Sequence, residues 1–384
     1  MAMSSVEEFR SEVRSWLRTH LTGEFAALKG RGGPGREHEE FEGRLAWERH
    51  MAAHGWTCIG WPERHGGRGA STAEQIAFHE EYALADAPAR VGHIGEQLLG
   101  PTLIDHGTEE QKARFLPPIR AVRELWCQGY SEPDAGSDLA GVRTRARLDE
   151  GEWVVDGQKI WTSLAHESQW CFVLARTTPG SRRHAGLSYL LVPLEQPGVE
   201  VRPIVQLTGT SEFNEVFFDG ARTDAAHVVG APGDGWAVAM ATLGYERGVS
   251  TLGQQVGFRR ELEALAALAA RNGALADPLL RDRLVRAWIG LETMRATALD
   301  PATAPSVAKL YWARWHRDLG ELAMDVRGAA SLLAAGEHGD PYDLDDWQRL
   351  FLFSRADTIY AGSDEIQRTI VAERILGLPK EVRA

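Results

Sequence analysis

The sequence predicts an α+β multidomain protein in which two helical domains flank a middle, antiparallel β-barrel-like domain. Apolar residues recur at helical spacing near both ends of the chain, and from about Trp126 the pattern changes to short apolar runs typical of strands. Glycine, proline and aspartate separate these runs, and long stretches rich in Ala, Leu and Arg follow residues 233–235 (GDG). We therefore expect an N-terminal helical domain at residues 1–122, the middle domain at 123–235 and a C-terminal four-helix bundle at 236–384.

The N-terminal domain is expected to begin with a helix, since Val6, Val13 and Leu17 fall on one helical face and Ser5 with Glu8 forms a capping-box pattern. Further helices are predicted at residues 39–54 and 71–84 and up to about 119. In the middle domain, residues 152–161 are predicted to form a strand, a turn at 156–157 and a second strand. The other predicted strands are 170–175, 186–192, 199–204 and 213–218. The predicted bundle helices are 236–271, 277–299, 307–335 and 345–376.

Composition limits the classes of partner. The chain has 384 residues, of which 43% are hydrophobic and 25% charged, as in ordinary globular proteins. A net charge of −12 argues against nucleic acid or an anionic membrane as the main partner. The first residues lack the apolar core of a signal peptide, and three widely spaced cysteines suggest neither a disulfide framework nor a zinc site. We therefore expect a cytoplasmic protein without a metal.

Two short patterns are set aside. Gly30, Gly32 and Gly35 match the letters of a dinucleotide fingerprint, but a predicted helix precedes them and no βαβ unit surrounds them, so we interpret them as a linker. His50 and His54 lie four residues apart on a predicted helix, a spacing that can bind zinc. No third ligand is evident in the sequence, and we interpret them as a surface pair.

Residues 129–141 (GYSEPDAGSDLAG) are the most informative segment. Their glycines and proline exclude a regular helix or strand interior, so they predict a loop whose backbone closely approaches another group, with Ser131 and Ser137 as hydroxyl partners. Three more segments follow in order: 157–163 (GQKIWTS), 244–247 (GYER) and 360–368 (YAGSDEIQR). Together the segments resemble the signature sequences of the acyl-CoA dehydrogenase family, and the likeness covers residues 6–378. The resemblance implies the same three-part architecture.

The resemblance also implies a chemistry. In this family a carboxylate removes the α-proton of an acyl thioester while the β-hydrogen leaves as hydride to the N5 atom of FAD. Ser131 and Ser163 are implied to hydrogen-bond near flavin N5 and O4, and Trp161 to pack against the ring. The implied flavin-binding residues are Gln128, Tyr130, Ser131, Gly136, Ser137, Trp161, Thr162 and Ser163.

The ADP half of FAD usually contacts a neighbouring subunit in the family, and here the sequence departs from the family pattern. Residues 270–273 (ARNG) and 325–329 (DVRGA) replace the Arg-x-x-Phe-Gly and Gln-x-x-Gly-Gly motifs. Asp325 would repel a pyrophosphate, although Arg327 could offset its charge. The implied ADP-side residues are Arg271, Asp325, Gly328, Ser363 and Glu365.

The catalytic base is a further departure. Many family members carry a Glu after the Tyr of the C-terminal motif, whereas Ala361 follows Tyr360 here. A minority of the family carries the base immediately before an Arg at the start of the bundle, and Glu246 precedes Arg247 in that place. Apolar neighbours would strengthen this carboxylate as a base, so we predict Glu246 as the catalytic base.

We therefore expect an FAD-dependent acyl-CoA dehydrogenase that forms a trans-2-enoyl-CoA and passes electrons to an electron-transfer flavoprotein. The implied substrate contacts are Ser137, Tyr245, Arg247, Tyr360, Ala361 and Gly362. Small residues at 361–362 and the resemblance to actinobacterial steroid side-chain enzymes favour a bulky acyl chain. We expect a homotetramer or homodimer. Two alternatives stay open: one subunit of a heterotetramer that completes FAD sites with a homologous chain, and an acyl-CoA or nitroalkane oxidase on the same fold.

Overall fold

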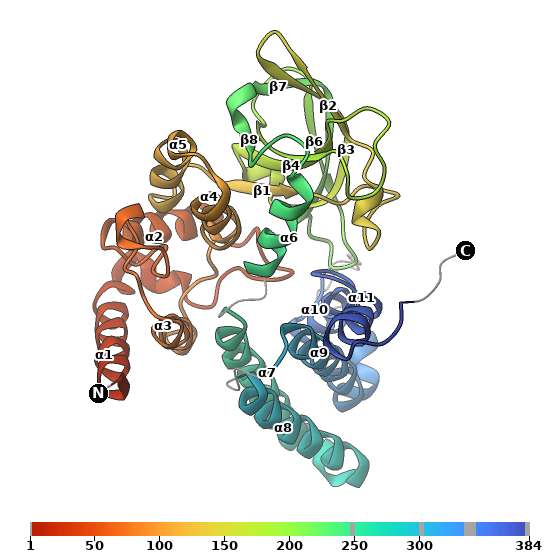
Figure 1. The fold of residues 1–384 in the computed structure, drawn as a ribbon. Coiled ribbons are helices and arrows are strands. Elements are labelled where there is room, and N and C mark those ends of the chain that lie inside the picture. The colour runs from red at the N-terminus through yellow and green to blue at the C-terminus, as the bar shows by residue number, and fades with distance from the viewer. Residues whose placement is uncertain (1, 246–249, 299–302, 334–342, 381–384) are drawn as a thin grey trace. The chain divides into compact units, whose positions relative to one another are not determined.

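The computed structural model describes residues 2–245, 250–298, 303–333 and 343–380 (Figure 1). It divides into two compact units, each described by itself. The first comprises Met1–Phe78, Ala85–Gln206 and Thr210–Gly248, and we call it the sheet unit. The second comprises His79–Leu84, Leu207–Gly209 and Val249–Ala384, and we call it the bundle unit.

Helices of the sheet unit account for the predicted N-terminal domain and the start of the predicted bundle. Thr108 caps one of them, since its hydroxyl accepts from the Gln111 N–H while the Gln111 side chain accepts from the Thr108 N–H. The α-helices are α1 (Ala2–His20), α2 (Phe41–Ala53), α3 (Thr72–Leu84, shared between the units), α4 (Gly100–His106), α5 (Glu109–Arg120) and α6 (Gly235–Tyr245). Trp61, Phe115 and Phe172 are buried in one core that joins α4, α5 and α6 to the sheet. The helices predicted at residues 39–54 and 71–84 are confirmed.

The sheet contains β1 (Trp126–Gly129), β2 (Arg145–Asp149), β3 (Glu152–Ser163), β4 (Trp170–Arg176), β5 (Leu187–Pro193), β6 (Val199–Ile204), β7 (Phe213–Asp224) and β8 (Val228–Val229). Its order is β6-β7-β3-β2-β4-β5-β8, with β1 paired to β4 (Figure 1). Most pairs are antiparallel, but β4 runs parallel to β1 and, at one residue pair, to β2. The sheet is therefore mixed, rather than wholly antiparallel as the turn-separated strands predicted.

The turn predicted at Asp156 and Gly157 is wrong. Both residues lie inside the continuous strand β3, where the register against β7 shifts after Val155. A Cβ atom on Gly157 would lie 2.5 Å from the Thr144 hydroxyl, so only glycine fits this close approach. The hairpin turn is instead at Glu150 and Gly151, whose positive φ angles of 51° and 87° suit a tight two-residue turn.

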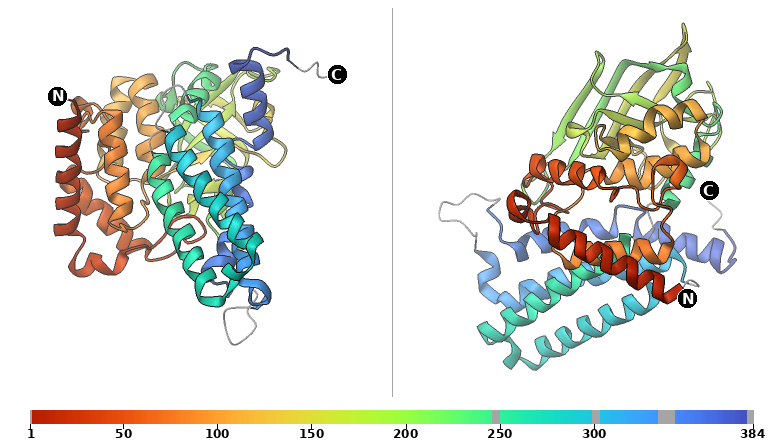
Figure 2. Two further views of the ribbon diagram at one scale, coloured as in Figure 1. Left: turned by 90° about the horizontal axis from the view of Figure 1, so that it is seen from below. Right: turned by 90° about the vertical axis from the view of Figure 1, so that its left-hand side faces the viewer.

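The bundle unit contains α7 (Ser250–Asn272), α8 (Pro278–Ala298), α9 (Pro305–Arg327), α10 (Asp346–Phe353) and α11 (Asp364–Ile370). In Figure 2 the long helices α7, α8 and α9 run side by side, and apolar residues such as Leu265, Leu291 and Leu322 form their core. The first predicted bundle helix corresponds to α6 and α7, on either side of residues outside the described part. The fourth is broken between α10 and α11, because Ala361 and Gly362 have φ angles of 51° and 84°, which no α-helix accommodates.

The glycine-rich segment near residue 30 is a hydrogen-bonded loop and not a free linker. The N–H groups of Gly35 and Glu37 donate to the Glu212 carboxylate at 3.0 and 3.1 Å, and Gly30 N–H donates to the Asp86 carbonyl at 2.8 Å. These hydrogen bonds act to lower the pKa of Glu212, but burial has the larger effect and raises this pKa. Within the described residues, no helix is both long and apolar enough to span a membrane.

Candidate active site

The predicted flavin loop follows β1 and is hydrogen-bonded to β3. Ile160 N–H donates to the Ser131 carbonyl at 3.0 Å, which brings Ser131 beside the strand end that carries Trp161. Tyr130 turns its ring into the core, edge-on to Phe172 at 5.8 Å between ring centroids. Tyr130 can therefore offer a ligand its backbone more readily than its side chain.

A buried ion pair that the sequence analysis missed holds this loop. The Lys159 ammonium donates to Glu132 at 2.8 Å and to the carbonyls of Tyr130 and Leu174 at 3.0 and 2.8 Å. Both side chains are buried. A lysine between strand residues was the available signal, since a buried lysine requires a partner.

Glu132 also binds the loop that follows. Its carboxylate accepts the N–H groups of Arg143 and Thr144 at 2.6 and 2.9 Å. Burial alone would raise the pKa of Glu132, but attraction to Lys159 and these hydrogen bonds outweigh burial and lower it. The carboxylate therefore stays charged, and it fixes both ends of residues 132–144.

The end of β3 has an irregular backbone that presents Trp161 outward. The register against β7 shifts between Lys159 and Thr162, and Trp161 has a φ angle of 59°, unusual for a bulky residue. Its side chain is 56% exposed and meets the Phe213 ring edge-on at 6.2 Å. Asn214 supports this geometry by donating from Nδ2 to the Thr162 carbonyl at 2.9 Å. Strain and an exposed indole together mark a place where a flat apolar ligand can pack.

Two residues of the predicted flavin segments carry buried polar atoms without a partner. Among the described residues, Gln128 Nε2 and Thr162 Oγ1 are buried side-chain atoms without a hydrogen-bond partner. In native proteins an ordered water or a small local rearrangement commonly satisfies such atoms. An isoalloxazine ring has polar atoms along its edge and apolar faces, and the exposed Trp161 suits one of these faces.

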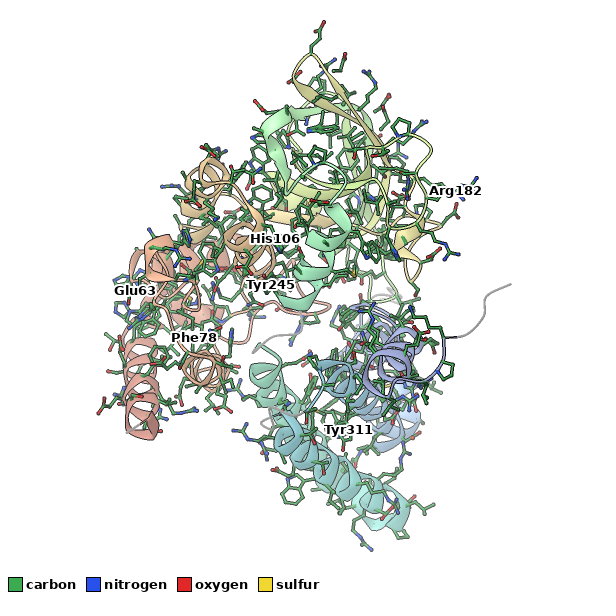
Figure 3. The ribbon with its side chains drawn as sticks, in the orientation of Figure 1. Glu63, Phe78, His106, Arg182, Tyr245 and Tyr311 are labelled. Atoms are coloured by element: carbon green, nitrogen blue, oxygen red, sulfur yellow. The ribbon has the colours of Figure 1, made fainter. Side chains whose placement is uncertain are left out.

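The remaining predicted residues of the sheet unit lie in different surroundings. Ser163 is half-buried beside Thr162, whereas Gly136 and Ser137 are exposed. Tyr245, labelled in Figure 3, ends α6, and its hydroxyl donates to Asp105 of α4. Burial and then this bond raise the pKa of Tyr245 to about 12. Tyr245 is therefore held as a neutral phenol by its own unit.

A basic pocket lies elsewhere on the sheet unit. It has a volume of about 410 Å³ and is lined by three arginines (Arg145, Arg147 and Arg176), by Asp156 and by the loop at residues 177–180. Arg176 donates to the carbonyls of Val142 and Arg183, which ties the pocket wall to the loop that carries Arg182 (Figure 3). The exposed Arg145 and Arg147 face a space large enough for a phosphorylated group.

In the bundle unit, Arg271, Asp325 and Gly328 lie at one end. Asn272, which the sequence analysis did not single out, connects the two helix ends by donating from Nδ2 to the Val326 carbonyl at 2.8 Å. Asp325 pairs with Arg283 at 2.6 Å.

Arg327 pairs instead with Asp345 at 2.5 Å, and it donates to the Ala330 carbonyl. The charge of Asp325 is therefore offset by Arg283, and not by Arg327 as the sequence suggested.

The C-terminal motif forms a separate patch. Gln367 donates from Nε2 to the carbonyls of Ala361 and Gly362 at 3.0 and 3.3 Å, which fixes the turn. The Ser363 hydroxyl caps α11 by accepting from Ile366 N–H.

Asp364 attaches this patch to α9 through Arg314 at 2.9 Å, whereas Glu365 is exposed. Arg314 precedes Asp325 by eleven residues, or about 16 Å along a helix. The predicted ADP-side residues thus fall into two patches. Glu246 and Arg247 lie outside the described residues.

Beside the C-terminal motif, His316 is enclosed by two carboxylates. Its Nδ1 lies 2.6 Å from Asp357 and its Nε2 3.0 Å from Glu261, and the ring stacks on Phe258 at 4.4 Å. Tyr360 donates its hydroxyl to the other oxygen of Asp357. Burial would lower the pKa of His316, but the hydrogen bonds and charges of Asp357 and Glu261 raise it to about 10.

We expect this imidazolium to make stability depend on pH. A pKa raised from 6.5 to about 10 adds stability that is fully present below pH 6.5 and is lost as the pH rises through 10. The melting temperatures of wild type and His316→Gln should therefore differ most near pH 6.5 and converge toward pH 10. A difference that stays constant over this range would contradict a charged His316.

The three-part fold and a loop and strand end suited to a flavin define an acyl-CoA dehydrogenase-type flavoenzyme. Family comparisons agree: the acyl-CoA dehydrogenase N-terminal, middle and C-terminal domains match residues 4–122, 127–221 and 233–376. The chain therefore belongs to the acyl-CoA dehydrogenase family, which confirms the resemblance and the enzyme class.

Relatives match over the full length. Acyl-CoA dehydrogenase IpdE1 of Mycobacterium tuberculosis (strain ATCC 25618 / H37Rv) is 66% identical over 390 residues, covering 99% of this chain and 100% of the relative. The Tcur3481-Tcur3483 steroid ACAD has a TM-score of 0.83 at 29% identity, with 98% of both chains covered. The ChsE4-ChsE5 complex from Mycobacterium tuberculosis has a TM-score of 0.79 at 28% identity, again with 98% of both chains covered.

Proposed function

We propose that this chain dehydrogenates an acyl-CoA thioester to the trans-2-enoyl-CoA with FAD as cofactor and an electron-transfer flavoprotein as acceptor. The carrying observation is the exposed Trp161 at the irregular end of β3, which the hydrogen bond from Ile160 N–H to the Ser131 carbonyl joins to the predicted flavin loop. It places a flat apolar surface next to the loop that carries the Ser131 hydroxyl. When bound, the flavin supplies the hydride acceptor of the reaction.

The chain's own residues would divide the remaining work. Ser131, Thr162 and Ser163 would hold the polar edge of the ring, and Trp161 would cover a face and exclude water. Glu246 would remove the α-proton of the substrate. The pocket with Arg145 and Arg147 offers the charge that a CoA phosphate needs.

A bulky acyl chain, such as a branched or steroid-derived one, is the substrate class we favour. Ala361 and Gly362 leave little side-chain volume at the C-terminal motif. The Tcur3481-Tcur3483 enzyme, similar to this chain over 98% of its length, is a steroid ACAD.

A second candidate is one subunit of a heteromer that completes its FAD sites with a homologous chain. Two of the similar structures pair different chains, as their names state. The departure at Glu365 also weakens the ADP-side patches for a homo-oligomer, because its exposed carboxylate places negative charge where the family contacts ribose or adenine, whereas Arg283 offsets the charge of Asp325.

Flavin content and turnover test both candidates. For a self-sufficient enzyme we expect the chain purified alone to hold about one FAD per subunit and to reduce an electron-transfer flavoprotein with a branched acyl-CoA. Colour and turnover only after co-expression with a second acyl-CoA dehydrogenase chain would select the heteromer. Rapid peroxide formation in air without another acceptor would select an oxidase.

A further inference from the structure

We propose that the N-terminal helices carry a zinc-class metal site formed by His20, His50 and His54. The three side chains each offer one ring nitrogen, and these nitrogens all lie within 4.8 Å of one another. His20 ends α1, whereas His50 lies in the last turn of α2 and His54 caps that helix. The third ligand, which the sequence did not reveal, is therefore His20 of α1. The prediction of a surface pair at His50 and His54 left this residue out.

The ring nitrogens are arranged as metal ligands require. His20 Nδ1 lies 2.9 Å from His50 Nε2, so these two atoms already share one proton that a metal ion would displace. His54 Nδ1 donates to the His50 carbonyl at 2.8 Å, so Nε2 is the ring nitrogen of His54 that can ligate a metal ion. A backbone carbonyl that fixes the tautomer in this way is the usual support of a metal-bound histidine. Ligands at about 2.0–2.1 Å from zinc lie about 3.3 Å apart, so small side-chain rotations suffice.

The surroundings favour a cation and hold the rings. His20 stacks on Trp16 at 4.6 Å, and His50 lies 5.3 Å from the Phe25 ring and 5.9 Å from the Trp47 ring. Both α1 and α2 end here, and a helix carries partial negative charge at its C-terminus.

Imidazole ligands with an open fourth position suit Zn²⁺, with water completing a tetrahedron. The ion would join the ends of α1 and α2. This site lies apart from the flavin loop in sequence, and its role would be to stabilise the N-terminal helices.

Calorimetric titration of the tag-free holoenzyme with ZnCl₂ tests the site. We expect one Zn²⁺ per chain with a Kd below about 10 µM, and a melting temperature that rises as zinc is added. His54→Gln should weaken binding by more than about tenfold, a loss that even an outer-shell contact can cause. His106→Gln is the matched control, because His106 is exposed in α4 and belongs to no such cluster, and it should leave binding unchanged.

His54→Gln changes an exposed side chain, so it should fold, and flavin content checks this. Absence of saturable binding below about 100 µM, or equal binding by His54→Gln and wild type, would overturn the proposal. Either result would leave the histidines as a hydrogen-bonded cluster.

Discussion

Glu246→Gln should slow reduction of the bound flavin by acyl-CoA about a hundred- to ten-thousand-fold, the usual contribution of a positioned general base. This corresponds to about 3–5 kcal/mol of transition-state stabilisation. Gln keeps the side-chain volume and removes only the basic oxygen, so flavin content and thioester affinity should persist. Anaerobic stopped-flow absorbance measures the rate.

Glu263→Gln provides the control, since Glu263 is an exposed carboxylate on α7 and should tolerate the change. Partial recovery on adding Ala361→Glu to the Glu246→Gln chain would show that the site accepts a base from either position. Reduction of the Glu246→Gln flavin at the wild-type rate would refute the assignment and direct the search to another carboxylate.

Lys159→Met should lower the free energy of unfolding by about 3–5 kcal/mol, the cost of removing one partner of a buried ion pair. Glu132 would keep its charge in a buried place, and the carbonyls of Tyr130 and Leu174 would lose a donor. Because Glu132 and Tyr130 belong to the predicted flavin loop, we also expect the flavin content to fall. Urea unfolding followed by fluorescence, with flavin assayed separately, measures the two effects.

Lys112→Met is the matched control. Lys112 pairs with Glu109 at 2.9 Å, and Glu109 is 82% exposed, so this change should cost far less stability than Lys159→Met. In the double variant Glu132→Gln/Lys159→Met, the loss should be smaller than the sum of the single losses, since no unpaired charge is left buried. Additive losses would show that Lys159 and Glu132 do not act as a pair.

The order of the domains could be read from the sequence because helical and strand periodicities differ along its length. Places where the backbone departs from these periodicities could not be predicted from the sequence. Gly157 has the composition of a turn, yet it pairs with Phe218 of β7 inside β3, where its close approach to Thr144 leaves no room for a side chain. Similarly, Ala361 and Gly362 interrupt a helical pattern through positive φ angles that only the folded surroundings fix.

The candidate site was predictable where a contiguous motif carries it. Ser131 and Trp161 lie thirty residues apart, and their segments are matched motifs that the structure brings together through Ile160. The residues that support the site were not predictable from the sequence. Asn214 and Asn272 each donate a hydrogen bond to a backbone carbonyl that is distant in the sequence, and no motif marks either residue. His20 was missed for the same reason, since only packing of α1 on α2 brings it to His50.

Anaerobic addition of a branched or steroid-derived acyl-CoA to the purified, flavin-loaded chain tests the central claim most directly. The visible flavin absorbance should be bleached, enoyl-CoA should form in equal amount, and an electron-transfer flavoprotein should restore the colour. A loaded flavin that no acyl-CoA thioester reduces, with the chain alone or beside a homologous partner, would contradict acyl-CoA dehydrogenation.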